Sequence, residues 1–296
     1  MKIRRKDYAI AISFLLPALL LIAFFIIYPV CDAVFLSFHS WKGIFGTPKK
    51  WVGLDNYINI LTSELFWKSM LNSFWFIVGG FLVLMPLSFA LALLITSKLH
   101  FTRFMKTAYF MPVILGTTTV ALMWTYILNP EWGAVAQILK WMGLDKAVFD
   151  WLSTPTLNVW CVVLVNEWMY AGYNMLIFAA GLVAIPQELY EAATIDGCGG
   201  WEKIRYITLP LCKNSFKIFS VLCVTGCLKV FDIIWAMTRG GPNNVSSTPA
   251  IMLYTQAFQY KLFGRSSAYS IILLVSGVIL SLVMNRIFRQ EDDLYS

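Results

Sequence analysis

Residues 69–97 read SMLNSFWFIVGGFLVLMPLSFALALLITS and contain no charged side chain. About 20 apolar residues, each rising about 1.5 Å in a helix, cross the hydrocarbon core of a bilayer. Similar uncharged runs occupy residues 8–31, 107–130 and 266–285. Two further apolar stretches, 158–183 and 216–238, are long enough to span a membrane but carry internal charges. The pattern predicts membrane-spanning helices.

The overall composition agrees with this interpretation. Hydrophobic residues make up 59% of the chain and charged residues 13%, whereas soluble domains average about 45–50% and about 25%. We therefore expect an all-α membrane protein with one transmembrane domain over residues 1–296 and a loop at 184–215. The expected spans are about 8–37, 69–97, 107–128, 158–183, 216–238 and 266–288.

The basic residues indicate the orientation. Cytoplasmic segments of membrane proteins carry an excess of Lys and Arg. With both termini inside, the inner segments hold more than half of the 23 Lys and Arg residues, although the outer loops are longer. The inner residues are Lys2, Arg4, Arg5, Lys6, Lys98, Arg103, Lys106, Lys203, Arg205, Lys213, Lys217, Arg286 and Arg289. Both termini and the 184–215 loop are thus expected in the cytoplasm. The net charge of +7 reflects topology and not a nucleic-acid-binding surface.

The cysteines and histidines indicate no catalytic or metal site. The six cysteines show no disulfide or metal-binding spacing, and the two histidines, His39 and His100, fall on opposite sides of the predicted membrane. A membrane-embedded enzyme is disfavoured because no cluster of His, Cys and acidic residues is present.

The 184–215 loop carries helix signals that a simple connector does not need. Pro186 suits the first position of a helix, and Glu188 and Glu191 favour its N-terminal end. Gly197 suits the C-terminal cap, and the Gly199-Gly200 pair allows a turn into a second short helix at about 201–207. Pro210 disfavours helix at Leu209. Ala192 and Ala193 leave one side of the first helix open to a close neighbour. The pattern predicts a helical hairpin that either packs as a connector or binds another protein.

The spacing in this loop resembles a known family. Glu-Ala-Ala at 191–193, then Gly197 after three intervening residues and Ile-Thr-Leu-Pro at 207–210 after nine more, form a spacing similar to the signature of permease subunits in binding-protein-dependent ABC importers. The run 185–197 resembles the carbohydrate branch of this family, the maltose type. Four further stretches resemble the same branch: 52–57 (VGLDNY), 109–112 (YFMP), 231–234 (FDII) and 238–242 (TRGGP). Cys198 and Arg239 depart from that pattern, where alanine and glycine are usual.

The resemblance implies a type I importer permease fold in a bacterial cytoplasmic membrane. It implies a second permease subunit, often a different chain, although a homodimer stays open, and two ATP-binding cassette subunits. It also implies an extracytoplasmic sugar-binding protein. ATP and Mg would be bound by the ATPase subunits, because this chain has no Gly-x-x-x-x-Gly-Lys-Ser/Thr loop. The hairpin would dock into the ATPase as a coupling helix, through Glu188, Glu191, Ala192, Ala193, Asp196, Gly197, Leu209 and Pro210.

Three charges are predicted inside the membrane. Glu167 and Lys229 lie at similar depths in the fourth and fifth spans, and Asp232 follows Lys229 by three residues. Since a charge at this depth needs a partner or water, we expect Lys229 to pair with Asp232, Glu167 or both. Such a pair either pins two spans together or lines a polar path. In a rival interpretation, an ion-gradient-driven secondary transporter, these charges form an ion relay. That interpretation leaves the loop signature unexplained, and we find no inverted repeat.

The fourth and fifth spans supply candidate residues for a substrate path. Asn166, Tyr170 and Tyr173 share one helical face, and Trp168 and Asn174 lie beside them. The facing positions of the fifth span are Gly226, Cys227 and Val230. In the resembling permeases the fourth span contributes to a sugar site at mid-membrane, and Asn166 and Tyr173 match its polar and aromatic positions. Ordinary packing between helices is the alternative for these residues.

Overall fold

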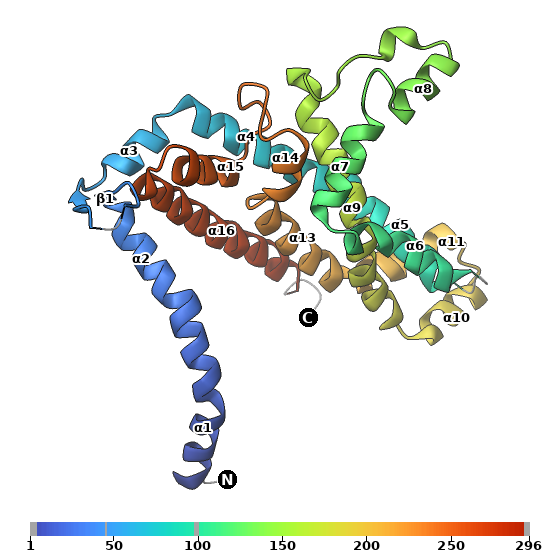
Figure 1. Cartoon of the computed structure of the whole chain (residues 1–296). Helices are drawn as coiled ribbons and strands as arrows, with labels where there is room; N and C mark the ends of the chain where they lie inside the picture. The colour runs from blue at the N-terminus through green and yellow to red at the C-terminus, as the bar shows by residue number, and fades with distance from the viewer. Residues whose placement is uncertain (1–4, 45, 98–100, 293–296) are drawn as a thin grey trace. The chain divides into compact units, whose positions relative to one another are not determined.

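The computed structural model describes residues 5–44, 46–97 and 101–292, and these are overwhelmingly helical (Figure 1). Lys2, Arg4, Lys98 and His100, used above, lie outside the described residues. The chain divides into two compact units, Met1–Ser63 with Met252–Leu274, and Glu64–Ile251 with Val275–Ser296. Each is described by itself, and the expected single domain stays a prediction.

The first unit begins with one long continuous helix. It continues through an antiparallel pair of two-residue strands, in which His39 pairs with Trp51. These strands are an exception to the all-α prediction. The elements are α1 (Arg5–Ile22), η1 (Ala23–Ile27), α2 (Tyr28–Ser37), β1 (His39–Ser40), β2 (Lys50–Trp51), α3 (Asp55–Leu61), η5 (Thr255–Gln259) and the first part of α16 (Phe263–Asp292).

Buried polar contacts hold this unit together. The Asn56 side-chain amide donates hydrogen bonds to the carbonyl oxygens of Ser37, at 2.8 Å, and His39, at 3.1 Å. The start of α16 lies directly on the strand pair, because a β-carbon added to Gly264 would sit 1.8 Å from the His39 carbonyl oxygen. Only glycine fits at that position.

The second unit contains the remaining helices arranged around α9. Its elements are α4 (Glu64–Gly79), η2 (Gly80–Leu84), α5 (Met85–Thr96), α6 (Thr102–Ile114), α7 (Thr117–Ile127), α8 (Ala134–Trp141), η3 (Asp145–Ala147), α9 (Pro155–Val183), α10 (Gln187–Ile195), α11 (Gly200–Lys203), η4 (Ile204–Thr208), α12 (Leu209–Leu211), α13 (Lys213–Cys227), α14 (Asp232–Met237), the first half of α15 (Pro249–Tyr254) and the last part of α16. Within this unit α9 packs against α4, α5, α6, α7, α13 and α14 (Figure 1).

Aromatic packing and one glycine fix α9 in place. Phe178 is fully buried, with ring centroids 5.6 Å from Phe89 of α5 and 4.9 Å from Phe216 of α13. Farther along α9, a β-carbon on Gly172 would lie 1.9 Å from the carbonyl oxygen of Tyr109, so α6 crosses α9 backbone to backbone. The cavity described below lies beside this rigid helix.

Three wide helical turns precede prolines. The π-helical segments η1, η2 and η4 each end two residues before a proline, namely Pro29, Pro86 and Pro210. A proline ring clashes with the carbonyl four residues back and lacks an N–H. In each case the residue before the proline donates its N–H to the carbonyl five residues back, as Met85 does to Gly80. The wider turn relieves the clash, so the helix continues past the proline.

The predicted spans are only partly reproduced as straight helices. Phe14–Ser37, Glu64–Thr96 and Phe263–Phe288 are each long and apolar enough to cross a membrane, and the number reaches six if each of three sharply bent helix pairs counts as one span. The second span begins earlier than predicted, at Glu64, where Glu64 and Lys68 pair at 2.7 Å across one turn.

Two spans predicted as uninterrupted are broken. The predicted 107–128 helix bends by 94° between α6 and α7, at Gly116, whose φ is +79°. The predicted 216–238 helix is split in two: α13 stops at Cys227, and α14 starts only at Asp232. Both breaks lie next to the cavity.

Candidate functional site

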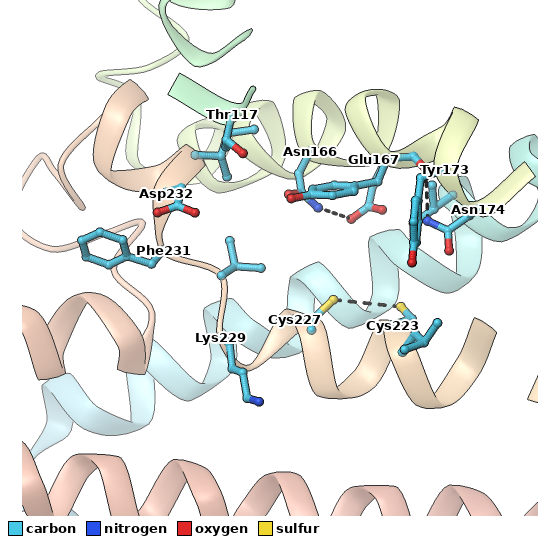
Figure 2. A pocket seen from close by; sticks show the side chains of 16 residues that line it. Thr117, Asn166, Glu167, Tyr173, Asn174, Cys223, Cys227, Lys229, Phe231 and Asp232 are labelled. Atoms are coloured by element: carbon cyan, nitrogen blue, oxygen red, sulfur yellow. Dashed lines mark hydrogen bonds between the residues drawn. The ribbon is translucent and has the colours of Figure 1, made fainter. Parts of the chain in front are cut away.

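A cavity of about 330 Å³ lies within the second unit (Figure 2). One face of α9 forms one wall, and α13 forms the opposite wall. Residues 229–231 of the non-helical stretch, Leu84 of η2 and the first residues of α7 and α14 complete the lining. Both helix breaks therefore contribute residues to the cavity.

The α9 wall carries most of the predicted path residues. Asn166, Tyr170 and Tyr173, which were predicted to share one face, all line the cavity, and so does Asn174. Asn174 donates to the Tyr170 carbonyl oxygen at 3.0 Å, which orients its amide. These side chains offer hydrogen-bond donors, acceptors and aromatic rings to a guest molecule.

Trp168 does not belong to this group. Its ring packs edge-to-face on Trp124 of α7, with centroids 5.4 Å apart, and it is not among the residues that line the cavity. The prediction that Trp168 lines the path is therefore corrected. Residues two apart on a helix point to nearly opposite sides, so Trp168 does not share the face of Asn166 and Tyr170.

Glu167 is a buried polar group in the wall with only one of its two oxygens hydrogen-bonded. Its side chain is only 1% exposed, and its Oε1 atom accepts one long hydrogen bond, 3.3 Å, from Asn166. Its Oε2 atom has no partner among the described residues. A buried carboxylate without a partner is costly in free energy. The arrangement leaves a buried acceptor without a partner in the α9 wall.

Lys229 does not pair with Asp232 or Glu167 as predicted. No ion pair involving Lys229 occurs in the part of the chain that the structure describes. The prediction assumed one continuous helix, on which residues three apart share a face. Since the helix is interrupted from Leu228 to Phe231, the Lys229 side chain points away from Asp232 (Figure 2). Both residues still line the cavity.

The α13 wall is less polar. Cys223, Gly226, Cys227 and Val230 face the cavity, and the Sγ atoms of the two cysteines are 4.0 Å apart. This wall lies close to η2, because a β-carbon added to Gly80 would lie 2.3 Å from the Cys223 Sγ atom.

Sequence reasoning missed two cavity residues at the helix breaks. Thr117 opens α7 directly after the bend, and Phe231 ends the non-helical stretch before α14. Pro112 and Gly116 were the available signal for the first break. The second break has no proline or glycine between residues 228 and 231 to announce it.

The 184–215 loop forms the expected hairpin of short helices. The Tyr190 and Thr208 hydroxyls lie 3.0 Å apart, and Lys203 donates to the Thr194 hydroxyl at 2.7 Å. These contacts tie α10 to the α11–η4 segment. Gly197 has φ of +81° and ends α10, which confirms its predicted capping conformation.

The hairpin presents acidic and apolar side chains outward. Glu188, Glu191 and Asp196 are exposed, and Ile195 and Trp201 are 87% and 70% exposed. Ala192 is exposed, whereas Ala193 is buried inside the hairpin.

The expected interruption at Leu209 is corrected. Leu209 and Pro210 are helical, in α12, because the wide turn η4 accommodates the proline ring. Cys212 follows, and burial raises the pKa of its thiol.

Comparison with known proteins agrees with this architecture. The sequence profile of a family described as the inner membrane component of binding-protein-dependent transport systems matches residues 6–291. A probable ABC transporter permease of Pyrococcus horikoshii is 34% identical over 283 residues, covering 94% of this chain and 95% of that protein. The trehalose/maltose transport system permease MalF of Thermococcus litoralis is 31% identical, covering 99% and 98%.

A solved structure has the same fold. A chain of a bacterial ABC transporter involved in the import of alginate, an acidic polysaccharide, superposes with a TM-score of 0.83 at 24% identity. The match covers 97% of this chain and 96% of that chain.

Proposed function

Because this chain belongs to the family of inner membrane components of binding-protein-dependent transport systems, we propose that it forms half of the path through which an ATP-driven importer takes up a sugar. The family is one of transport components and not of enzymes. Its membership makes the chain a multi-pass membrane permease, in agreement with its long apolar helices.

The proposal extends to partners. The other half of the path is a second permease subunit, and two ATP-binding cassette subunits bind ATP and Mg. An extracytoplasmic binding protein delivers the sugar, and the assembly lies in a bacterial cytoplasmic membrane with both termini of this chain inside. The relative in Thermococcus litoralis, named for trehalose and maltose, supports a sugar cargo.

The observation that carries the proposal is the α9 wall of the cavity. Asn166 and Asn174 offer amide groups, while Tyr170 and Tyr173 offer hydroxyls and ring faces. Sugars bind through hydrogen bonds to their hydroxyls and through contacts between their C–H surfaces and aromatic rings. A cavity of about 330 Å³ has the size of a small-ligand site.

Glu167 gives the wall a preference for groups that donate hydrogen bonds. An ionised carboxylate accepts hydrogen bonds and donates none, so a turn of the buried Glu167 side chain toward the cavity would offer its unpartnered Oε2 atom to the hydroxyl hydrogens of a sugar. Asp232 adds a second carboxylate, and Lys229 a single cation. With two carboxylates and one cation, the lining favours neutral solutes over anionic ones.

The hairpin is proposed to couple this path to ATP hydrolysis. Glu188, Glu191 and Asp196 project from it, and the exposed Ile195 and Trp201 give it an apolar surface to bury. Closure of the ATPase pair on ATP would move the docked hairpins and turn the path outward. The change of state arises from the different grip of the ATPase on the hairpin in each state.

The ion-gradient carrier is not favoured. The chain belongs to a family of binding-protein-dependent transport components, and the residues of the supposed relay, Glu167, Lys229 and Asp232, form no ion pair with one another in the described structure.

The test is sugar-stimulated ATP hydrolysis by the complete complex in lipid nanodiscs. A neutral-sugar-loaded binding protein is expected to stimulate hydrolysis, and Asn166→Ala with Tyr170→Ala is expected to lower uptake in proteoliposomes. Trp168→Phe is the matched control on α9, because this side chain packs on Trp124 instead. Uptake by this chain without the ATPase subunits would overturn the proposal.

A further inference from the structure

Cys223 and Cys227 form a pair of thiols on the cavity wall. They lie on successive turns of α13 with their Sγ atoms 4.0 Å apart (Figure 2). Both are free cysteines, 9% and 6% exposed, and both line the cavity. Figure 2 shows them across the cavity from Asn166 and Glu167.

Helix geometry keeps this pair from closing into a disulfide. Residues four apart on a helix have β-carbons about 5–6 Å from one another. A disulfide needs β-carbons about 3.5–4.5 Å apart. Direct oxidation would therefore distort α13, and the pair stays as two thiols that one bridging atom can join.

The surroundings select the kind of bridging atom. Protein-bound zinc takes about four ligands, and the described residues contain no group of three or more His, Cys, Asp and Glu side chains able to hold a metal ion. A trivalent arsenic atom that already carries one carbon substituent needs only two sulfurs. We propose that Cys223 and Cys227 are a dithiol binding site for monosubstituted trivalent arsenicals.

The reaction balances without an oxidant or reductant. Phenylarsine oxide and two thiols give a phenylarsenic dithiolate and one water. Two arsenic–sulfur bonds form, the arsenic–oxygen bonds break, and both thiol protons leave with the oxygen. Arsenic stays trivalent and each sulfur stays at the thiol level. Small rotations about the Cα–Cβ bonds bring the sulfurs to the spacing that one atom requires.

The bound group would occupy the cavity. Its phenyl ring would point into a space of about 330 Å³ that also contains Asn166 and Tyr170. Capture is therefore expected to block uptake. This consequence rests on the proposed function, whereas capture itself does not.

The experiment uses the assembled complex in nanodiscs, treated with phenylarsine oxide and then washed with excess 2-mercaptoethanol, a monothiol. Intact mass spectrometry of this chain is expected to show one phenylarsenic group. Dithiothreitol, a dithiol, is expected to remove it. Cys223→Ser or Cys227→Ser should weaken retention at least about a hundredfold, because the second bond no longer forms within one molecule. Cys198→Ser and Cys212→Ser are the matched controls and should retain the group.

The outcomes separate the two proposals. An adduct that survives the monothiol wash in Cys223→Ser or Cys227→Ser, or its absence from the wild type, overturns the dithiol site. An adduct that forms without slowing uptake contradicts the role of the cavity as the path and leaves the dithiol site standing. Alanine variants of the two cysteines serve as a control for assembly. Size-exclusion chromatography is expected to show that these variants still form the complex, so that a loss of capture does not reflect a loss of assembly.

Discussion

The sulfur of Cys223 occupies the space that a side chain on Gly80 would need. A β-carbon added to Gly80 would lie 2.3 Å from the Cys223 Sγ atom. Gly80 also opens the wide turn η2, which precedes Pro86. The approach of α13 to this turn therefore depends on a missing side chain, and it sets the position of one of the two cavity thiols.

Gly80→Ala is expected to separate the two cavity thiols without preventing assembly. The added methyl group meets a sulfur, which can move by rotating about one bond, so the Cys223 sulfur should turn away from Cys227. We expect retention of phenylarsine oxide to fall at least about tenfold, as the two-bond attachment is weakened. Retention equal to the wild type would show that the sulfur does not move. Gly277→Ala, which meets nothing within 4 Å, is the control.

Gly172→Ala should instead destabilise the protein. Its β-carbon would lie 1.9 Å from the Tyr109 carbonyl oxygen, and backbone cannot rotate aside. Overpacking of this kind costs about 1–3 kcal/mol. The measurement is the thermal unfolding midpoint of the purified complex, again against Gly277→Ala. Equal midpoints for the two variants would contradict the close crossing of α6 and α9.

Gly197→Val is expected to uncouple ATP hydrolysis from transport. Nothing lies within 4 Å of its added β-carbon, so the cost comes only from its φ of +81°. A left-handed conformation costs an L-residue about 1–2 kcal/mol, and Asn tolerates it better. The Val variant should insert normally and lose sugar-stimulated hydrolysis, whereas Gly197→Asn should keep most of it. Gly200→Ala is the control in the same loop. Full coupling in the Val variant would contradict the docking role.

Glu167→Gln is expected to change stability and uptake in opposite directions. The amide keeps the shape of the side chain and removes a buried carboxylate whose Oε2 atom has no partner, so the thermal midpoint should hold or rise. Hydrogen bonds to a charged group contribute about 1.5–3 kcal/mol, so sugar uptake should fall by about tenfold or more. A joint fall of stability and uptake would indicate a purely structural role for Glu167.

The two cysteines of the hairpin region should differ in reactivity. Cys212 is 1% exposed, and burial raises the pKa of its thiol, whereas Cys198 is partly exposed. Because the thiolate is the nucleophile, maleimide at pH 7.5 should modify Cys198 well before Cys212. The Cys212 rate should keep rising with pH above the ordinary range for a thiol. Single-cysteine variants analysed by mass spectrometry measure both rates, and equal rates at pH 7.5 would contradict the burial of Cys212.

The sequence was sufficient for the class of fold and for the hairpin. Uncharged runs predict long apolar helices, and the glycine and glutamate positions predict where α10 ends and what it exposes. The shared face of Asn166, Tyr170 and Tyr173 also follows from helical spacing alone. These predictions depend on contacts within one element.

Predictions that assumed an unbroken helix failed. Lys229 and Asp232 were placed on one face, yet the chain leaves the helix between them. The interruption is compensated by contacts distant in sequence, such as the hydrogen bond from the Thr248 hydroxyl to the Val230 carbonyl oxygen at 2.7 Å. Such tertiary contacts have no local sequence signal, and they also decide which groups border the cavity.

The wide turns before Pro29, Pro86 and Pro210 have a consequence for helical-wheel diagrams. Each admits one residue more than a regular turn, and one residue corresponds to a rotation of about 100° about the axis. Side chains after Leu84 therefore point about a quarter-turn away from where a wheel drawn through α4 and α5 as one rod would place them. A designer who replaced Pro86 and restored regular pitch would rotate every later residue of that helix, and so exchange which of them face α9.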